Sequence, residues 1–196
     1  MAERHWQFVI IALGELILVT GLTFTRSGFG AGREAAAVVA FATAALLWRV
    51  NIYRAGEILG AAVAAAPDPV CASITSVYLH PVVVAGLVTI SAGDELVITH
   101  PGGHMQQAWI AVILGGPALF LAGRMALEYV VFSRVSLDRV IGVLVLAAVS
   151  PAMVFAPPLL AAVAAAVVLA GVAIADAARA WRYPDEPPSP HSGRLS

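Results

Sequence analysis

The sequence contains no lysine and a single cysteine, and these scarcities exclude several kinds of protein. All 11 basic residues are arginine, and 12 acidic residues bring the net charge to −1. Nucleic-acid-binding domains carry a basic face, so we expect no nucleic-acid partner. One thiol, Cys71, cannot build a disulfide framework or a cysteine-rich metal site. We therefore expect neither a metal nor a cofactor.

Signature motifs of common enzymes are absent as well. The sequence has no Gly-Lys-Ser/Thr phosphate loop, no Gly-x-Ser-x-Gly nucleophile turn and no His-Glu-x-x-His zinc motif. An intramembrane enzyme would need a nucleophile beside a base, and no such constellation stands out. We therefore expect that the protein is not an enzyme.

Charged residues are few, and hydrophobic residues take their place. Only 12% of the residues are charged, 60% are hydrophobic, and the mean hydropathy is +0.89. Soluble domains carry about 25% charged residues. This composition predicts an all-α, multi-pass membrane protein whose main surroundings are the lipid bilayer.

Apolar stretches long enough to cross a bilayer recur along the chain. About 20 apolar residues span the hydrocarbon core. Six stretches qualify and together predict a six-helix transmembrane domain over residues 1–183: 6–24, 35–53, 77–92, 108–123, 140–155 and 159–175. The remaining residues, 184–196, are polar and rich in proline and serine, which predicts a disordered cytoplasmic tail.

The arginines predict how the spans are oriented. If the chain crosses six times, nine of the 11 arginines fall on one side and only Arg26 and Arg33 on the other. Arginine-rich loops stay in the cytoplasm, so both termini should be cytoplasmic. Glu128 and Asp138 should form surface pairs with neighbouring arginines on that side.

Glu15 is the main candidate for a functional residue. It lies about nine residues into an apolar span, where a carboxylate loses its hydration and needs a partner, a proton or a water-filled cavity. Arg49 and His80 are expected closer to the cytoplasmic boundary, within reach of Glu15. We expect these three, with Asn51 as a lesser member, to form an intramembrane polar site for a proton or a small solute.

Two alternatives remain open for these residues. Arg49 can extend to the lipid headgroups, and Glu15 can make a purely structural hydrogen bond between helices. The acids and histidines of the expected external loop from Gly93 to Gln107 match no closed metal motif. We interpret that loop as solvated: its members are Asp94, Glu95, His100 and His104.

Several short segments carry a family resemblance by their order. They are Glu3-Arg4-His5, Ile10-Ile11-Ala12-Leu13-Gly14-Glu15, Tyr78-Leu79-His80, Gly93-Asp94-Glu95 and Leu114-Gly115-Gly116-Pro117. In this order they resemble the C-terminal half of the bacterial low temperature requirement A protein family. The sequence departs from the family pattern at Trp6-Gln7 and at Arg49.

The resemblance implies a bacterial inner-membrane protein with a role in growth at low temperature, and it adds His5 as a secondary site residue. Family members carry a further membrane half upstream, so a missing N-terminal half or a homo-oligomer is an expected partner. Two functions remain open. One is transport or ion coupling through Glu15 and His80, and the other is a structural or stress-adaptive component without transport activity.

Overall fold

The computed structural model describes the backbone of residues 2–52, 69–132 and 135–182. It describes the side chains of residues 10–50, 79–130, 135–179 and 181. This part of the chain is helical and contains no strand. The elements in order are α1 (Ala2–Ser27), α2 (Ala31–Ile52), α4 (Pro69–Thr99), α5 (Gln107–Ile113), α6 (Gly115–Phe132), α7 (Leu137–Val149), the short 3-10 helix η1 (Ala152–Phe155) and α8 (Pro158–Arg182). The all-α prediction is confirmed.

Glycine and proline set several of the helix ends. Gly28 has φ of 76°, a left-handed conformation that glycine adopts without strain, and it directly follows the end of α1. Pro101 follows shortly after the end of α4. Pro158 is the first residue of α8, where its missing N–H costs no helical hydrogen bond.

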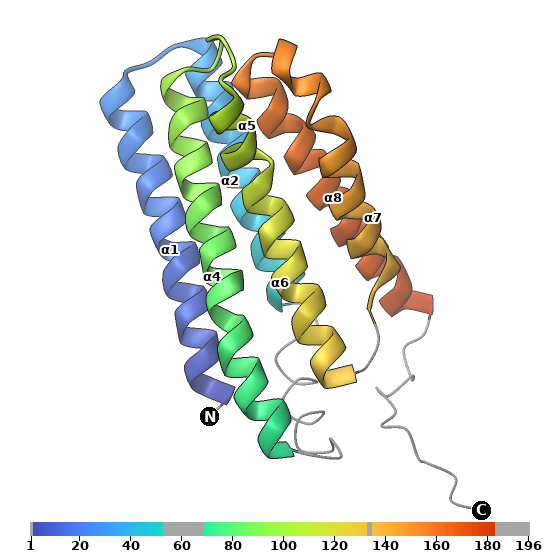
Figure 1. Cartoon of the computed structure of the whole chain (residues 1–196). Helices are drawn as coiled ribbons and strands as arrows, with labels where there is room; N and C mark the ends of the chain where they lie inside the picture. The colour runs from blue at the N-terminus through green and yellow to red at the C-terminus, as the bar shows by residue number, and fades with distance from the viewer. Residues whose placement is uncertain (1, 53–68, 133–134, 183–196) are drawn as a thin grey trace, which may run out of the picture.

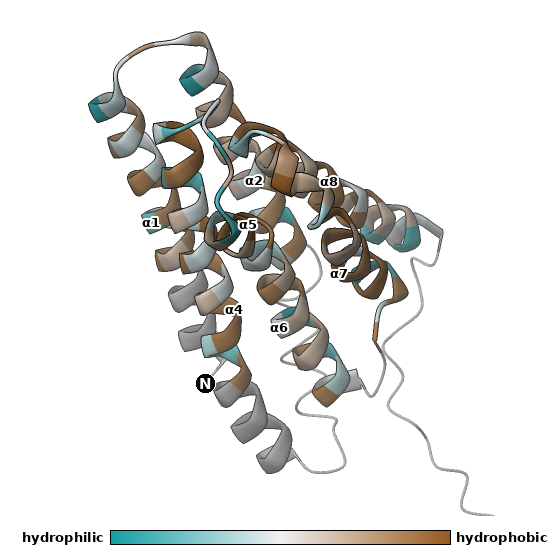
Figure 2. Ribbon diagram, turned by 45° about the horizontal axis from the view of Figure 1, so that its top comes forward, coloured by the Kyte–Doolittle hydropathy of each residue, from teal (hydrophilic) through white to brown (hydrophobic). Residues whose placement is uncertain are grey.

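The helices form one bundle in which successive long elements run in opposite directions (Figure 1). Helix α1 begins and α8 ends at the same end of this bundle. Hydrophobic residues cover most of the helices, and hydrophilic residues lie mainly toward their ends (Figure 2). Within the described residues, five stretches are long and apolar enough to cross a membrane: Ile10–Ser27, Ala31–Val50, Leu79–Thr99, Gln107–Val130 and Pro158–Arg179. The helix α7, at 13 residues, is shorter than these, so the predicted fifth span, 140–155, stays a prediction.

The third span ends later than the sequence indicated. We expected a solvated loop to begin at Gly93, but α4 continues to Thr99, so this expectation was wrong for Asp94 and Glu95. No proline occurs between Gly93 and Pro101 to end the helix earlier, and Asp94 is buried against the bundle. The fourth span is likewise longer than expected, since α5 and α6 together reach Phe132. The tail 184–196 lies outside the described residues.

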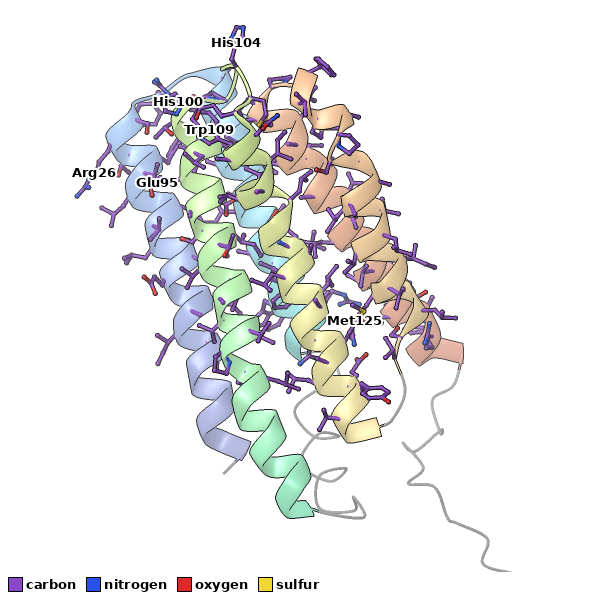
Figure 3. The ribbon with its side chains drawn as sticks, in the orientation of Figure 1. Arg26, Glu95, His100, His104, Trp109 and Met125 are labelled. Atoms are coloured by element: carbon purple, nitrogen blue, oxygen red, sulfur yellow. The ribbon has the colours of Figure 1, made fainter. Side chains whose placement is uncertain are left out.

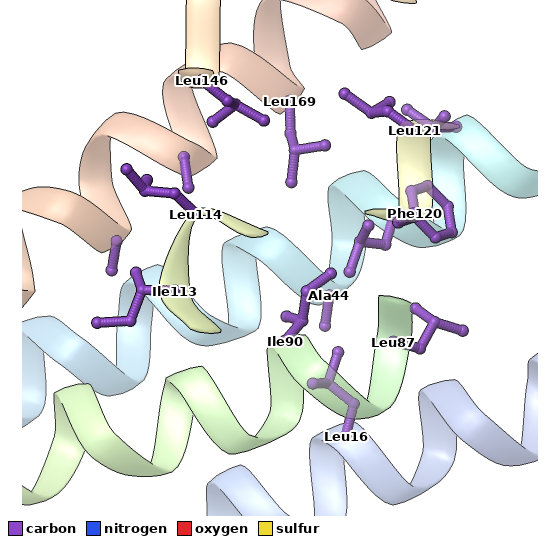
Figure 4. Close-up of a cluster of buried hydrophobic side chains, with 14 of the residues drawn as sticks. Leu16, Ala44, Leu87, Ile90, Ile113, Leu114, Phe120, Leu121, Leu146 and Leu169 are labelled. Carbon is purple, nitrogen blue, oxygen red and sulfur yellow. The ribbon is translucent and has the colours of Figure 1, made fainter. Parts of the chain in front are cut away.

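The centre of the bundle is the contact between α4 and α6, which is unusually close at glycines. A Cβ atom added to Gly86 would lie 2.6 Å from the backbone nitrogen of Phe120, and one at Gly116 would lie 2.9 Å from that of Ile90. Phe120 itself is fully buried. Figure 4 shows Leu16, Ala44 and Leu87 in the same apolar core, which therefore joins α1 and α2 to α4. Small residues allow such close packing between membrane helices.

Candidate functional site

The structure places Glu15 at the middle of α1, but on its outward side. The carboxylate is solvent-exposed in the isolated chain and makes no hydrogen bond or ion pair within the described residues. Its Cα lies about 18 Å from the nearer end of α1 at ~1.5 Å rise per residue. Glu15 therefore lies at the depth that the sequence indicated, facing away from the other helices.

The other predicted members of the Glu15 site lie elsewhere in the bundle. Arg49 is exposed in the last turn of α2, and His80 is half-buried on α4. Both residues take part in interactions of their own, and no hydrogen bond or ion pair from Glu15 to either of them is observed among the described residues. The side chains of His5 and Asn51 lie outside the described residues. The three-residue polar site stays a prediction that no observed interaction supports.

Asp94 occupies a position that the sequence analysis misjudged. Asp94 is only 7% exposed, and its side-chain oxygen Oδ2 is buried without a hydrogen-bond partner in the described part of the chain. It lies about 8 Å before the end of α4 at ~1.5 Å per residue. The preceding residue, Gly93, packs against Ile113 of α5, which helps to close that side of the bundle.

A buried carboxyl group of this kind has a specific chemical capacity. Its ionised form is costly in an apolar interior unless a cation or a hydrogen-bond donor approaches it. Uptake of a proton or a cation removes that cost. Asp94 is therefore suited to bind and release a positive charge inside the bundle.

The end of the bundle next to Asp94 carries polar and aromatic side chains. Figure 3 shows Glu95, His100 and Trp109 near this end, with His104 projecting from the connecting loop. The rings of His100 and Trp109 lie 5.1 Å apart. Among the described residues no group of three or more histidine, cysteine or acidic side chains could hold a metal ion. The solvated environment expected for His100 and His104 agrees with their exposure.

A second set of ionisable residues connects α6, α7 and α8. Arg139 on α7 forms ion pairs with Glu128 on α6 and, at 3.0 Å, with Asp176 on α8. A further pair links Arg179 on α8 to Asp138 on α7. With the nearby Arg124 these residues make up what we call the charge network: Arg124, Glu128, Asp138, Arg139, Asp176 and Arg179.

The charge network is partly buried and electrically balanced. Arg139 is 5% exposed, whereas the side chains of Glu128 and Asp176 are 22% and 24% exposed. Arg139 lies in the first turn of α7, where the helix dipole disfavours a cation, so the two acids offset an unfavourable position. The sequence correctly predicted that Glu128 and Asp138 pair with arginines. It predicted surface pairs, whereas the observed ion pairs join three helices.

Like Asp176, Arg124 is a member of the network that the sequence analysis missed. Its position in the chain indicated a cytoplasmic flank, but the residue is only 7% exposed on α6. Its Nε is buried and has no hydrogen-bond partner in the described residues, while Asp176 attracts its charge at longer range. The labelled neighbour Met125 shows where this turn of α6 lies in Figure 3. No sequence signal distinguishes Arg124 from a headgroup-facing arginine.

Comparison with known proteins identifies relatives of the chain. The model of the family described as bacterial low temperature requirement A protein (LtrA) matches residues 1–174. An uncharacterized protein from Rhizobium meliloti (strain 1021) is 30% identical over 152 residues, which cover 76% of this chain and 36% of the relative. The chain thus spans about a third of that relative's length. No solved structure matches the chain.

Proposed function

The chain belongs to the bacterial low temperature requirement A protein family, and from that premise we propose that it is a multi-pass inner-membrane protein that moves a proton or a small ion through its bundle. Family membership and the five long apolar helices support a membrane protein. The single observation that carries the ion-coupled function is the buried Asp94 carboxylate, whose Oδ2 has no hydrogen-bond partner among the described residues.

We propose that the chain crosses the membrane six times with both termini in the cytoplasm. The fifth crossing along the chain consists of α7 followed by η1, and α7 runs beside α8 in the opposite direction (Figure 1). Support for the orientation comes from the nine arginines that this topology assigns to one side. The charge network would then lie toward the cytoplasmic side, and Asp94 toward the opposite side.

Two sites compete for the ion-coupling role. Glu15 with His80 was the sequence-based hypothesis, and Glu15 faces away from the other helices, whereas His80 is half-buried on α4. Asp94 lies inside the bundle, where a bound proton is shielded from lipid. We therefore favour Asp94 as the residue that carries the charge, and we keep Glu15 as the competing site.

The second candidate function is a structural component of the membrane, for example in adaptation to low temperature. The charge network favours it, because most of its acids and arginines neutralise one another and join three helices. Residues that only lock helices together need no exchange with solvent. In this case the protein would fold stably without moving any ion.

Proton movement into vesicles distinguishes these functions. We expect purified wild-type protein in liposomes containing a pH-sensitive dye to acidify the interior when a potassium diffusion potential is imposed. The Asp94→Asn variant should fall to the rate of empty vesicles, because an amide at this position cannot take up a proton. The dye signal after addition of valinomycin gives the rate.

The control for this experiment is the neighbouring acid. Glu95 is exposed on the same helix, so Glu95→Gln should keep the wild-type rate. Loss of flux in Glu15→Gln but not in Asp94→Asn would return the function to the sequence-based site. A wild-type rate equal to that of empty vesicles would favour the structural component.

A further inference from the structure

The outward side of α1 carries a regular stripe of exposed residues. Ile11, Leu18 and Leu22 are 64%, 62% and 44% exposed, and Glu15 and Thr25 are exposed as well. The intervals along this stripe alternate between four and three residues, which is the spacing that packs one helix along another. We call these five residues the α1 stripe.

Glycines flank the α1 stripe and leave space beside it. A Cβ atom added to Gly14 or to Gly21 would find no atom within 4 Å. Glycines on the surface of a membrane helix allow a second helix to approach its backbone closely. The α1 stripe therefore has the residue spacing of a helix-packing surface, and the glycines beside it leave room for the backbone of a second helix.

Because it contains Glu15, the α1 stripe is unfavourable as a surface that contacts only lipid. The exposed positions in the middle of α8 are all apolar or small, including Leu160, Val163, Val167 and Ile174, and such a face needs no protein partner in lipid. Glu15 lies at the middle of α1, where an isolated carboxyl group facing hydrocarbon is costly. The Thr25 hydroxyl of the α1 stripe already donates a hydrogen bond to the Leu22 carbonyl within the helix, so Glu15 is the polar group of the stripe that still requires a hydrogen-bond partner.

We propose that the α1 stripe is the interface with a second copy of this chain. In a twofold-symmetric pair of parallel α1 helices, Glu15 of one protomer faces Glu15 of its partner. One carboxyl group donates its O–H and the other accepts it, so the same residue supplies both halves of the hydrogen bond. This inference goes beyond the proposed transport function and needs only that α1 crosses the membrane.

The charges on the rest of the surface favour the symmetric arrangement over other contacts between two copies. Among the described residues, the exposed arginines lie near helix ends: Arg26, Arg49 and Arg179. In parallel copies none of them lies at the depth of Glu15. Contact between the two α1 stripes gives the carboxyl group a donor at its own level.

Cysteine cross-linking tests the geometry of this interface. In a background with Cys71→Ala, the variant Leu18→Cys places a thiol on the α1 stripe, and oxidation in native membranes should give a disulfide-linked dimer. The matched control is Leu144→Cys on α7, because both leucines are 62% exposed. That variant should stay monomeric. Equal cross-linking of the two variants, or none at Leu18→Cys, would overturn the proposal.

Substitution of Glu15 tests the chemistry. The Glu15→Gln variant keeps a donor and an acceptor and should dimerise like the wild type. The Glu15→Leu variant should weaken dimerisation about tenfold, the size expected for one hydrogen bond between membrane helices. Light scattering of the purified protein over a range of detergent concentrations measures the change.

The outcomes of the substitution experiment are decisive in both directions. A monomeric wild type, or a Glu15→Leu variant that dimerises as strongly as the wild type, contradicts the proposal. If Glu15→Leu does not fold, the comparison of Leu18→Cys with Leu144→Cys still decides the question. Failure of the dimer leaves proton flux through Asp94 untouched, so the two proposals are tested separately.

Discussion

Replacing Arg139 with methionine should destabilise the folded protein by about 3 kcal/mol, because a buried ion pair that loses one partner leaves the other charge uncompensated. Both Glu128 and Asp176 rely on Arg139 for their ion pairs. The expected result is a clear drop in the apparent Tm of the purified protein, measured by thermal unfolding followed by size-exclusion chromatography.

A matched arginine on the same network provides the control. Arg179 also pairs with an acid, Asp138, but its side chain is 49% exposed. Exposed ion pairs contribute about 1 kcal/mol or less, so Arg179→Met should change the Tm only slightly. Adding Glu128→Gln and Asp176→Asn to Arg139→Met should restore part of the lost stability, because the two acids that lost Arg139 are then neutral; the rescue stays incomplete because the buried Arg124 loses the attraction of Asp176. Equal effects of the two arginine substitutions would show that burial does not govern the network.

Substitution of Gly86 with leucine should have an effect of similar size or larger. The Cβ position of Gly86 lies 2.6 Å from the Phe120 backbone nitrogen, a distance at which α4 and α6 must separate. Inserting side-chain atoms into a packed core costs roughly 1–3 kcal/mol, and here the obstacle is backbone rather than a movable side chain. We expect little monodisperse protein from this variant in size-exclusion chromatography.

The control for the glycine experiment is Gly171 on α8. A Cβ added there meets no atom within 4 Å, so Gly171→Leu should give a wild-type yield. If both variants fold equally well, the close contact between α4 and α6 does not hold the bundle together.

The sequence alone was sufficient for the class of protein and for most of the spans. Transfer of an apolar run into a bilayer depends on the local sum of side-chain hydrophobicities, which can be read along the chain. The family was also evident from the order of short segments, and the match over residues 1–174 confirms it. Charge alone was a poor guide to span ends, because Asp94 and Glu95 suggested a loop while α4 continues to Thr99.

Reading along the sequence is enough to establish that the protein consists of apolar helices and that Glu15 lies near the middle of the first of them. Which side chains face inward depends on the tertiary structure: it turned Glu15 outward, buried Asp94 and Arg124, and brought Arg139 to Asp176, 37 residues away in the chain. The physical reason is that depth along a helix follows from counting residues. The rotation of each helix about its axis follows instead from packing against helices that are distant in sequence.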